Sequence, residues 1–178
     1  MKAKYLIIFI LVLTLTSCAN FNVSGQLYQD ARVYVKEGRK DFAFLSLIEI
    51  LRQSPNDRLA LQAKFGVAEY YYDIADYSQS LKEFKEFLKS YKSSKLSVFA
   101  KAYLYRIISD VKWLQNKDTT ELAESIKKEF FSKSAFFVFS EFKEAKAVSV
   151  LSNKYVLKEY VDKIDIFRND KLFLSVSP

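Results

Sequence analysis

The pattern of hydrophobic and polar positions divides the chain into three regions. Residues 5–16 form an uncharged run, apolar residues recur at helical spacing from residue 26 to residue 131, and the helical period fades after Ser132, where β-branched residues become more frequent. In residues 81–91 the apolar side chains share one helix face, and lysines with Glu86 share the other. Such a charged face is typical of a solvated surface with i,i+3 charge pairs. The middle region is therefore predicted to be a series of amphipathic helices.

A repeat of 37 residues is visible within this helical region. The first copy has Ala31, Tyr34, Ala43, Leu47, Ile50 and Pro55, and the second has Ala68, Tyr71, Ser80, Phe84, Phe87 and Lys92. Small residues let two helices approach closely, and the larger pair that follows packs against the next unit. The spacing is similar to that of the tetratricopeptide repeat. Two features depart from it: the bulky aromatic residue early in the first helix is Leu27 or Lys64, and Lys92 replaces the terminal proline.

A third copy is incomplete at the sequence level. Residues 97–116 supply a further first helix with Ala102 and Tyr105 at the expected spacing, but the second helix at about residues 119–131 fits the pattern poorly. About three units are usually needed for a stable array. The predicted fold is mainly α, with tetratricopeptide-like antiparallel helix-hairpin repeats at residues 26–131 and a small C-terminal β-hairpin appendage.

Residues 132–178 are predicted to be a mixed segment that contains a β-hairpin at residues 163–176. Two runs flank Asn169-Asp170, and Asn and Asp both tolerate the positive φ of a type I′ turn. Residues 136–139 and 147–151 are further short strands or loop pieces. The expected apolar face of the hairpin consists of Ile164, Ile166, Leu172 and Leu174. Because an isolated hairpin is only marginally stable, we expect this face to pack on the last helices, around Trp113, Leu114 and Phe130.

The first 17 residues are predicted to be a lipoprotein signal peptide. Lys2 and Lys4 precede the uncharged run, which has the length of a signal-peptide core and is shorter than the roughly 20 residues that cross a bilayer. Residues 15–18 (Leu-Thr-Ser-Cys) resemble the lipobox of bacterial lipoproteins. The resemblance implies that Cys18 receives a diacylglyceryl group on sulfur, becomes the N-terminus after cleavage, and is then acylated by chains such as palmitate. Residues 18–25 would form the tether. The alternative is an ordinary secretory signal.

Composition argues against several function classes. Cys18 is the only cysteine, and the chain has no histidine, which is the commonest general base and metal ligand. No glycine-rich phosphate loop or nucleophile elbow is present. We therefore expect no enzyme, catalytic residue, metal or cofactor. After residue 17 the chain holds 26 basic and 21 acidic residues without a concentrated basic stripe, so nucleic acid is not an expected partner.

The second repeat copy extends the family resemblance. Residues 68–91 are similar to bacterial envelope proteins with tetratricopeptide repeats, above all to BamD, the repeat lipoprotein of the β-barrel assembly machinery, and to the periplasmic coordinator of the Tol–Pal system. The resemblance covers roughly residues 26–110. It implies an architecture and a compartment, the cell envelope. Ala19, rather than an aspartate, follows the cysteine, which favours the outer membrane facing the periplasm.

The same resemblance indicates a surface for a partner. In tetratricopeptide proteins one set of first-helix positions lines a concave face, and tyrosine suits such a face because it offers a large contact area at low entropic cost. The corresponding residues are Tyr28, Arg32, Lys36, Gln62, Phe65, Glu69, Tyr72 and Asp73. For Tyr72, simple burial is an equally good interpretation. The favoured function is a membrane-anchored adaptor that binds another envelope protein or an extended peptide. The alternative is a structural or surface lipoprotein that binds peptidoglycan or lipid.

Overall fold

Six α-helices and a four-stranded sheet make up the part of the chain that the structure describes. It is a computed structural model, which describes residues 23–131, 144–146, 154–160 and 162–178. The elements are α2 (Val23–Lys36), α3 (Lys40–Gln53), α4 (Ala60–Asp73), α5 (Tyr77–Ser90), α6 (Leu96–Asp110), the 3₁₀ turn η1 (Lys112–Leu114), α7 (Lys117–Phe130), β1 (Glu144–Lys146), β2 (Lys154–Glu159), β3 (Ile164–Arg168) and β4 (Lys171–Val176). The predicted signal peptide, Cys18, and the segments 136–139 and 147–151 lie outside the described residues. The tether was predicted to extend to residue 25, but α2 already begins at Val23.

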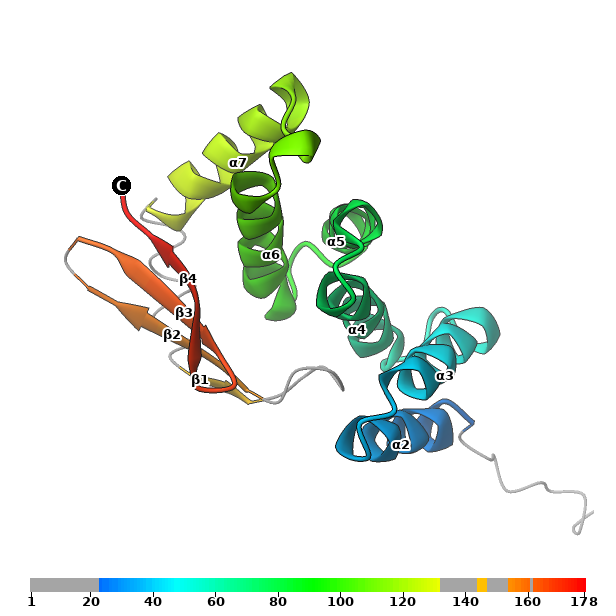
Figure 1. Ribbon diagram of the computed structural model, residues 1–178. Helices are drawn as coiled ribbons and strands as arrows, with labels where there is room; N and C mark the ends of the chain where they lie inside the picture. Colours follow the sequence, from blue (N-terminus) through cyan, green and yellow to red (C-terminus); the bar gives the residue numbers. More distant parts are fainter. Residues whose placement is uncertain (1–22, 132–143, 147–153, 161) are drawn as a thin grey trace, which may run out of the picture.

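The helices pair as three consecutive hairpins, α2–α3, α4–α5 and α6–α7 (Figure 1). The first two are closed by three-residue turns whose middle residues, Gly38 and Ala75, both have positive φ (76° and 62°). Their backbone hydrogen bonds also correspond: the amide of Gly38 donates to Val35 at 3.1 Å, and that of Ala75 donates to Tyr72 at 3.0 Å. Because each pair of corresponding residues is 37 apart, the sequence repeat is a repeat of backbone conformation.

Side-chain packing follows the same repeat. Each of the small and large core positions is completely buried: Ala31, Ala43, Leu47 and Ile50 in the first copy, and Ala68, Ser80, Phe84 and Phe87 in the second. The Ser80 hydroxyl donates a hydrogen bond of 3.0 Å to the carbonyl of Ala68. The two helices can approach this closely only because both residues are small. The prediction of a mainly α fold built from helix hairpins is confirmed.

The third hairpin has a longer connection than the other two. Six residues, 111–116, separate α6 from α7, and α6 ends at Asp110 rather than continuing to Asn116 as predicted. Asn116 caps α7: its side chain accepts from the Thr119 amide at 3.0 Å, and the Asn116 amide donates to the Thr119 hydroxyl at 2.9 Å. The buried stripe of α7 then runs through Thr119, Ala123, Ile126 and Phe130. This inserted length explains why the 37-residue pattern does not continue into α7.

The C-terminal region is an antiparallel sheet in the order β1-β2-β3-β4, larger than the hairpin that the sequence predicted. The β3–β4 turn has positive φ at Asn169 (52°) and Asp170 (60°), which confirms the predicted turn. The register shifts after Ile166, which pairs with Leu174, whereas Phe167 pairs with Leu172. Phe173 is thus an extra residue of β4, a β-bulge.

The bulge changes which side chains face inward. Ile164, Ile166, Phe173 and Val176 are buried, whereas Leu172 is 55% exposed. The prediction that Leu172 shares the apolar face is therefore wrong, because an extra residue reverses the alternation of a strand. The sheet does pack on the helices and joins a core that includes Phe130 and Leu114. Trp113, however, is 69% exposed and does not belong to that core.

Enlarging Ala68 tests the packing of the repeat. We expect Ala68→Leu to lower the free energy of unfolding by about 1–3 kcal/mol, because the added side chain overpacks a fully buried helix crossing. The control is Gln79→Leu on the exposed side of α5, which should leave the thermal melt nearly unchanged. Equal melting temperatures for Ala68→Leu and the unmodified protein would show that the crossing is not tightly packed.

Candidate functional site

The first helices of the three hairpins, α2, α4 and α6, form one surface, here called the first-helix face. The sheet lies along α6 on the side away from α5 (Figure 1) and covers this face at α4 and α6. Tyr155 of β2 stacks on Phe99 of α6, with ring centroids 4.4 Å apart, and meets the edge of Phe65 of α4 at 6.1 Å. The sheet therefore contacts the first helices of both the second and the third hairpin.

Phe173, the bulged residue of β4, fills the other part of the same contact. Its ring lies 4.6 Å from the ring of Tyr103 and 5.8 Å from that of Tyr72, centroid to centroid. The guanidinium carbon of Arg106 lies 4.9 Å from the Phe173 centroid, in cation–π geometry. In a regular strand, alternation would leave Phe173 in solvent. Because of the bulge, its side chain points inward and makes the main apolar contact of β4.

A buried polar cluster lies between these aromatic contacts. Glu69 of α4 is completely buried, as are Tyr103 of α6 and Tyr155 of β2. The Glu69 carboxylate accepts hydrogen bonds from both tyrosine hydroxyls, at 3.0 Å from Tyr103, and the two hydroxyl oxygens lie 2.9 Å apart. Burial, and then the neighbouring Glu69 carboxylate, raise the pKa of Tyr103 well above its usual value, so this hydroxyl stays protonated as a donor.

Arg168 of β3 neutralises the cluster. Its guanidinium donates two hydrogen bonds to the Asp73 carboxylate, at 2.7 and 3.2 Å, and lies 3.6 Å from the Glu69 carboxylate. Lys40, at the start of α3, donates a hydrogen bond of 3.0 Å to the Asp73 carboxylate, and the Lys40 side chain is the more exposed of the two. Two carboxylates and two cations therefore balance. We call these six residues, including Tyr103 and Tyr155, the clamp, because they join α3, α4 and α6 to β2 and β3.

The clamp also shifts the ionisation of its members. Burial by itself would raise the pKa of Asp73, but the hydrogen bonds and charge of Arg168, followed by those of Lys40, outweigh it and leave the pKa lowered. Burial likewise opposes the charge of Arg168, whereas Glu69 and Asp73 raise its pKa. Asp73 and Arg168 are therefore both charged at neutral pH. The arrangement is an ion-pair network that is buried at Glu69 and reaches solvent at Lys40, and it joins the helices to the sheet.

The predicted partner surface divides into two parts in the structure. Phe65, Glu69, Tyr72 and Asp73, all on α4, contact the chain's own sheet or the clamp. Gln62, also on α4, is half-buried, and its Oε1 atom lies in the interior without a hydrogen-bond donor.

On α2, the two basic residues of that surface are accessible. Arg32 and Lys36 are exposed, and Tyr28 is half-buried with its pKa raised by burial. Half of the predicted partner-surface residues are thus occupied by contacts within the protein, and binding of a partner to the others stays a prediction.

Four members of the clamp were not predicted as site residues: Lys40, Tyr103, Tyr155 and Arg168. Tyr103 had a signal, because Ala102 aligns with Ala68 and so Tyr103 takes the repeat position of Glu69. Lys40 is the first residue of α3, the second helix of its hairpin, and the two strand residues approach α4 only through tertiary structure. For these three, the repeat pattern contains no signal.

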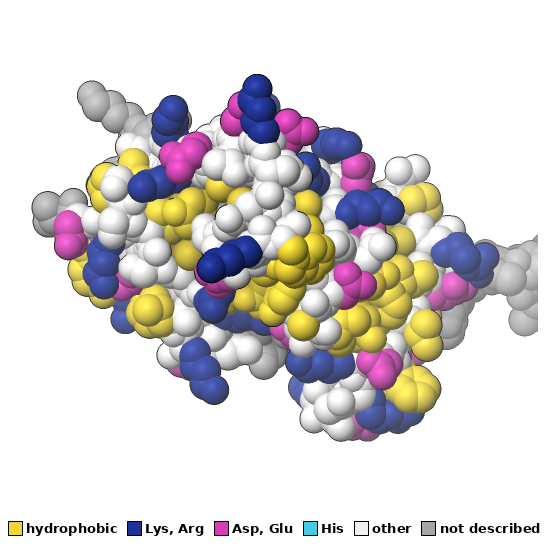
Figure 2. Space-filling model, turned by 45° about the horizontal axis from the view of Figure 1, so that its top comes forward, with side chains coloured by type: hydrophobic (Ala, Val, Ile, Leu, Met, Phe, Trp, Pro, Cys, Tyr) yellow, Lys and Arg dark blue, Asp and Glu magenta, His cyan; other side chains and the backbone are white. Residues whose placement is uncertain are grey.

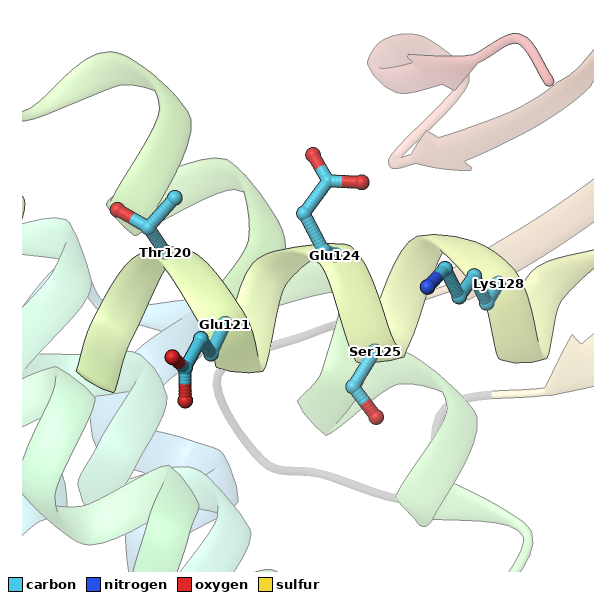
Figure 3. Close-up of a pocket in the computed structure, with 5 residues that line it drawn as sticks. All are labelled: Thr120, Glu121, Glu124, Ser125 and Lys128. Carbon is cyan, nitrogen blue, oxygen red and sulfur yellow. The ribbon is translucent and has the colours of Figure 1, made fainter. Parts of the chain in front are cut away.

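Two surface hollows lie away from the clamp. One of about 350 Å³ follows α7 and is lined by Thr120, Glu121, Glu124, Ser125 and Lys128. Figure 3 shows that these side chains leave the single helix on different sides and do not converge. The other, about 440 Å³, is lined by Leu51, Pro55, Asn56, Lys64, Ser90 and Tyr91. Within the described ranges, no group of three or more acidic, histidine or cysteine side chains is placed to hold a metal ion.

Comparison with known proteins adds no relative. No protein-family model matches the chain, and no curated protein matches it significantly. In the part of the chain with described coordinates, none of the helices has the length and apolarity needed to span a bilayer.

Removing the guanidinium of Arg168 should open the clamp. Arg168→Met leaves Glu69 and Asp73 in a buried site without their main cation, so we expect a loss of about 3–5 kcal/mol in the free energy of unfolding. Arg52→Met is the matched control, because Arg52 pairs with Glu49 at the surface and exposed ion pairs contribute little. Hydrogen exchange should show faster exchange of β3 and β4 amides in Arg168→Met. Unchanged exchange and equal melts would rule out the clamp as the main attachment.

The lowered pKa of Asp73 predicts a pH dependence of stability. In the unfolded chain this carboxyl has an ordinary pKa of about 3.9, so between that value and the lower folded pKa the unfolded state binds more protons. The contribution of Asp73 is therefore complete above about pH 4 and is lost as the pH falls through the folded pKa. Asp73→Asn should melt below the unmodified protein at neutral pH, and the two melting curves should converge in acid. A constant difference across this range would contradict the assignment.

Proposed function

We propose that this chain is a membrane-anchored helical-repeat lipoprotein that acts as a protein–protein interaction adaptor in the bacterial envelope, in outer-membrane protein assembly or envelope maintenance. The observation that carries the proposal is the unequal occupation of the first-helix face. The sheet fills this face at α4 and α6, whereas Arg32 and Lys36 of α2 are exposed. Stacked helix hairpins are a general binding architecture, because they present an extended surface on one side.

The accessible part of the face indicates the chemistry of the partner. Arg32 and Lys36 follow each other at i,i+4 on α2, one turn beyond Tyr28. Two exposed cations one helical turn apart fit a partner segment that carries acidic side chains. A peptide running along the whole face would have to displace the sheet and break the buried Arg168–Asp73 pair. The proposal is therefore a partner bound at the α2 end.

The anchor belongs to the same proposal. The lipobox at residues 15–18 supports attachment through lipidated Cys18, in the outer membrane facing the periplasm. Two or three acyl chains hold a protein firmly at a membrane, whereas one holds it only marginally. No reaction is assigned to the clamp, whose two carboxylates, Glu69 and Asp73, both face the Arg168 guanidinium.

Site-specific photo-cross-linking in intact cells tests the adaptor. A photoreactive residue at position 32 or 36 should give a cross-linked envelope protein, and the same residue at the exposed positions Lys82 or Lys89 of α5 should not. The double change Arg32→Glu and Lys36→Glu should abolish cross-linking from position 28, because it reverses the proposed charge complementarity. Cross-links to glycan strands instead of protein would favour the structural alternative. Equal products from α2 and α5 would contradict the assigned surface.

The anchor is tested separately by Cys18→Ser. This variant should appear in the soluble exported fraction or remain unprocessed, because the sole acylation site is lost. If it is cleaved elsewhere and still sediments with membranes, lipid attachment through Cys18 is wrong.

A further inference from the structure

The outer side of α3 carries an apolar stripe with an arginine at each end. Phe42, Leu45 and Ile48 lie three residues apart along the helix and are 49%, 60% and 37% exposed. Arg39 precedes the stripe and Arg52 follows it, at spacings of three and four residues. Successive residues at these spacings lie on neighbouring positions of one helix side. We call these five residues (Arg39, Phe42, Leu45, Ile48 and Arg52) the α3 stripe.

Apolar exposure is concentrated in the first hairpin. Of the nine exposed large hydrophobic side chains among the described residues, five lie on α2 and α3, and only Trp113 is more exposed than Leu45. Figure 2 shows hydrophobic side chains gathered in patches between charged ones, including patches on the half of the molecule that holds α2 and α3. In a repeat array the end unit normally turns a polar face outward. The apolar outer side of α3 at this end of the array is therefore expected to bind another surface.

Each arginine at an end of the stripe pairs with a neighbouring carboxylate, Arg39 with Glu37 at 3.2 Å and Arg52 with Glu49, and Arg39 also contacts two aromatic rings. The guanidinium carbon of Arg39 lies 4.3 Å from the Phe42 ring centroid and 4.7 Å from that of Tyr34. Arg52 pairs with Glu49 at 2.5 Å while its side chain remains 68% exposed. An apolar strip bounded by cations is the arrangement with which a helix lies in the plane of a lipid interface, with its apolar side chains at the acyl boundary and its cations among anionic headgroups.

The length of the predicted tether indicates which surface lies against the α3 stripe. Only four residues lie between Cys18 and Val23, the first residue of α2, so the two α-carbons are five residue steps and at most roughly 18 Å apart. Because α2 and α3 are antiparallel, the start of α2 lies beside the end of α3, near Arg52. If Cys18 carries the lipid, as the proposed function holds, the first hairpin is kept against the headgroups. The surface nearest to the α3 stripe is then the membrane itself.

We infer that the α3 stripe docks on the lipid surface next to the anchor, so that the protein sits on its membrane in a fixed orientation. The inference rests on the proposed function only for its anchor. It adds a second contact, made by Phe42, Leu45 and Ile48, which holds the first hairpin down and directs the distal hairpins and the sheet away from the bilayer. Arg32 and Lys36 lie on α2 rather than on the stripe, and so remain available to a partner.

Tryptophan quenching by brominated lipids tests the docking. The chain has a single tryptophan, Trp113, which is exposed and distant from the first hairpin along the array. In the acylated protein reconstituted into vesicles of phosphatidylethanolamine with a minority of phosphatidylglycerol, bromination of the acyl chains should leave Trp113 fluorescence unchanged. The variants Trp113→Phe/Leu45→Trp and Trp113→Phe/Ile48→Trp should be strongly quenched. Trp113→Phe/Leu172→Trp, which probes an exposed apolar position on the sheet, is the matched control and should not be quenched.

The outcomes separate docking from anchoring. The mass of the Cys18 peptide and flotation with vesicles report the anchor. If Cys18 is found unmodified, its thiol, the only one in the chain, can be coupled to a maleimide lipid, and the quenching pattern still reads the stripe. Equal quenching at positions 45 and 172, or none at 45 and 48, would overturn the docking. A blue shift of the position-45 tryptophan that depends on protein concentration without vesicles would overturn it in favour of a second copy of the chain.

Discussion

The buried carboxylate of Glu69 is the constraint on which the arrangement of this protein depends. An unpaired carboxylate in an apolar interior is costly, so the groups that satisfy it must come to it wherever they lie in the chain. Two tyrosine hydroxyls do so from α6 and β2, and the Arg168 guanidinium of β3 supplies the charge. The helix array and the sheet are therefore held in one relative position, because Tyr155 of β2 and Arg168 of β3 must both reach the same carboxylate.

Apolar and polar contacts have different roles where the sheet meets the helices. The rings of Phe99 and Phe173, with the inward isoleucines of β3, remove most of the apolar surface from water, and this term is non-directional. The paired charges contribute less net stability, because their desolvation offsets much of their attraction. The paired charges instead fix the position of the sheet, because a shifted sheet would separate Arg168 from Asp73 and leave both charges buried and unpaired. Burial thus drives the docking, and the clamp selects its register.

A self-covered face changes how a helical repeat can be used. In an open array the whole first-helix side is free for a ligand, whereas here α4 and α6 already bind a segment of the same chain. In the part of the chain that the structure describes, the first hairpin exposes the cations of α2 and the apolar stripe of α3, on its two different helices. The proposed partner contact and the proposed lipid contact therefore share one end of the molecule, close to the short tether that precedes Val23.

The sequence by itself determined the local structure, because local structure depends on spacing. Small and large residues 37 apart specified two equivalent hairpins, and Asn169-Asp170 specified the turn of the sheet. Tertiary structure alone decided that β1 and β2 join that hairpin, that the bulge turns Phe173 inward, and that Glu69 meets β2 and β3. These outcomes depend on pairing between strands and helices far apart in the chain, which no periodicity within one element encodes. For the same reason a surface predicted for a partner holds the protein's own sheet.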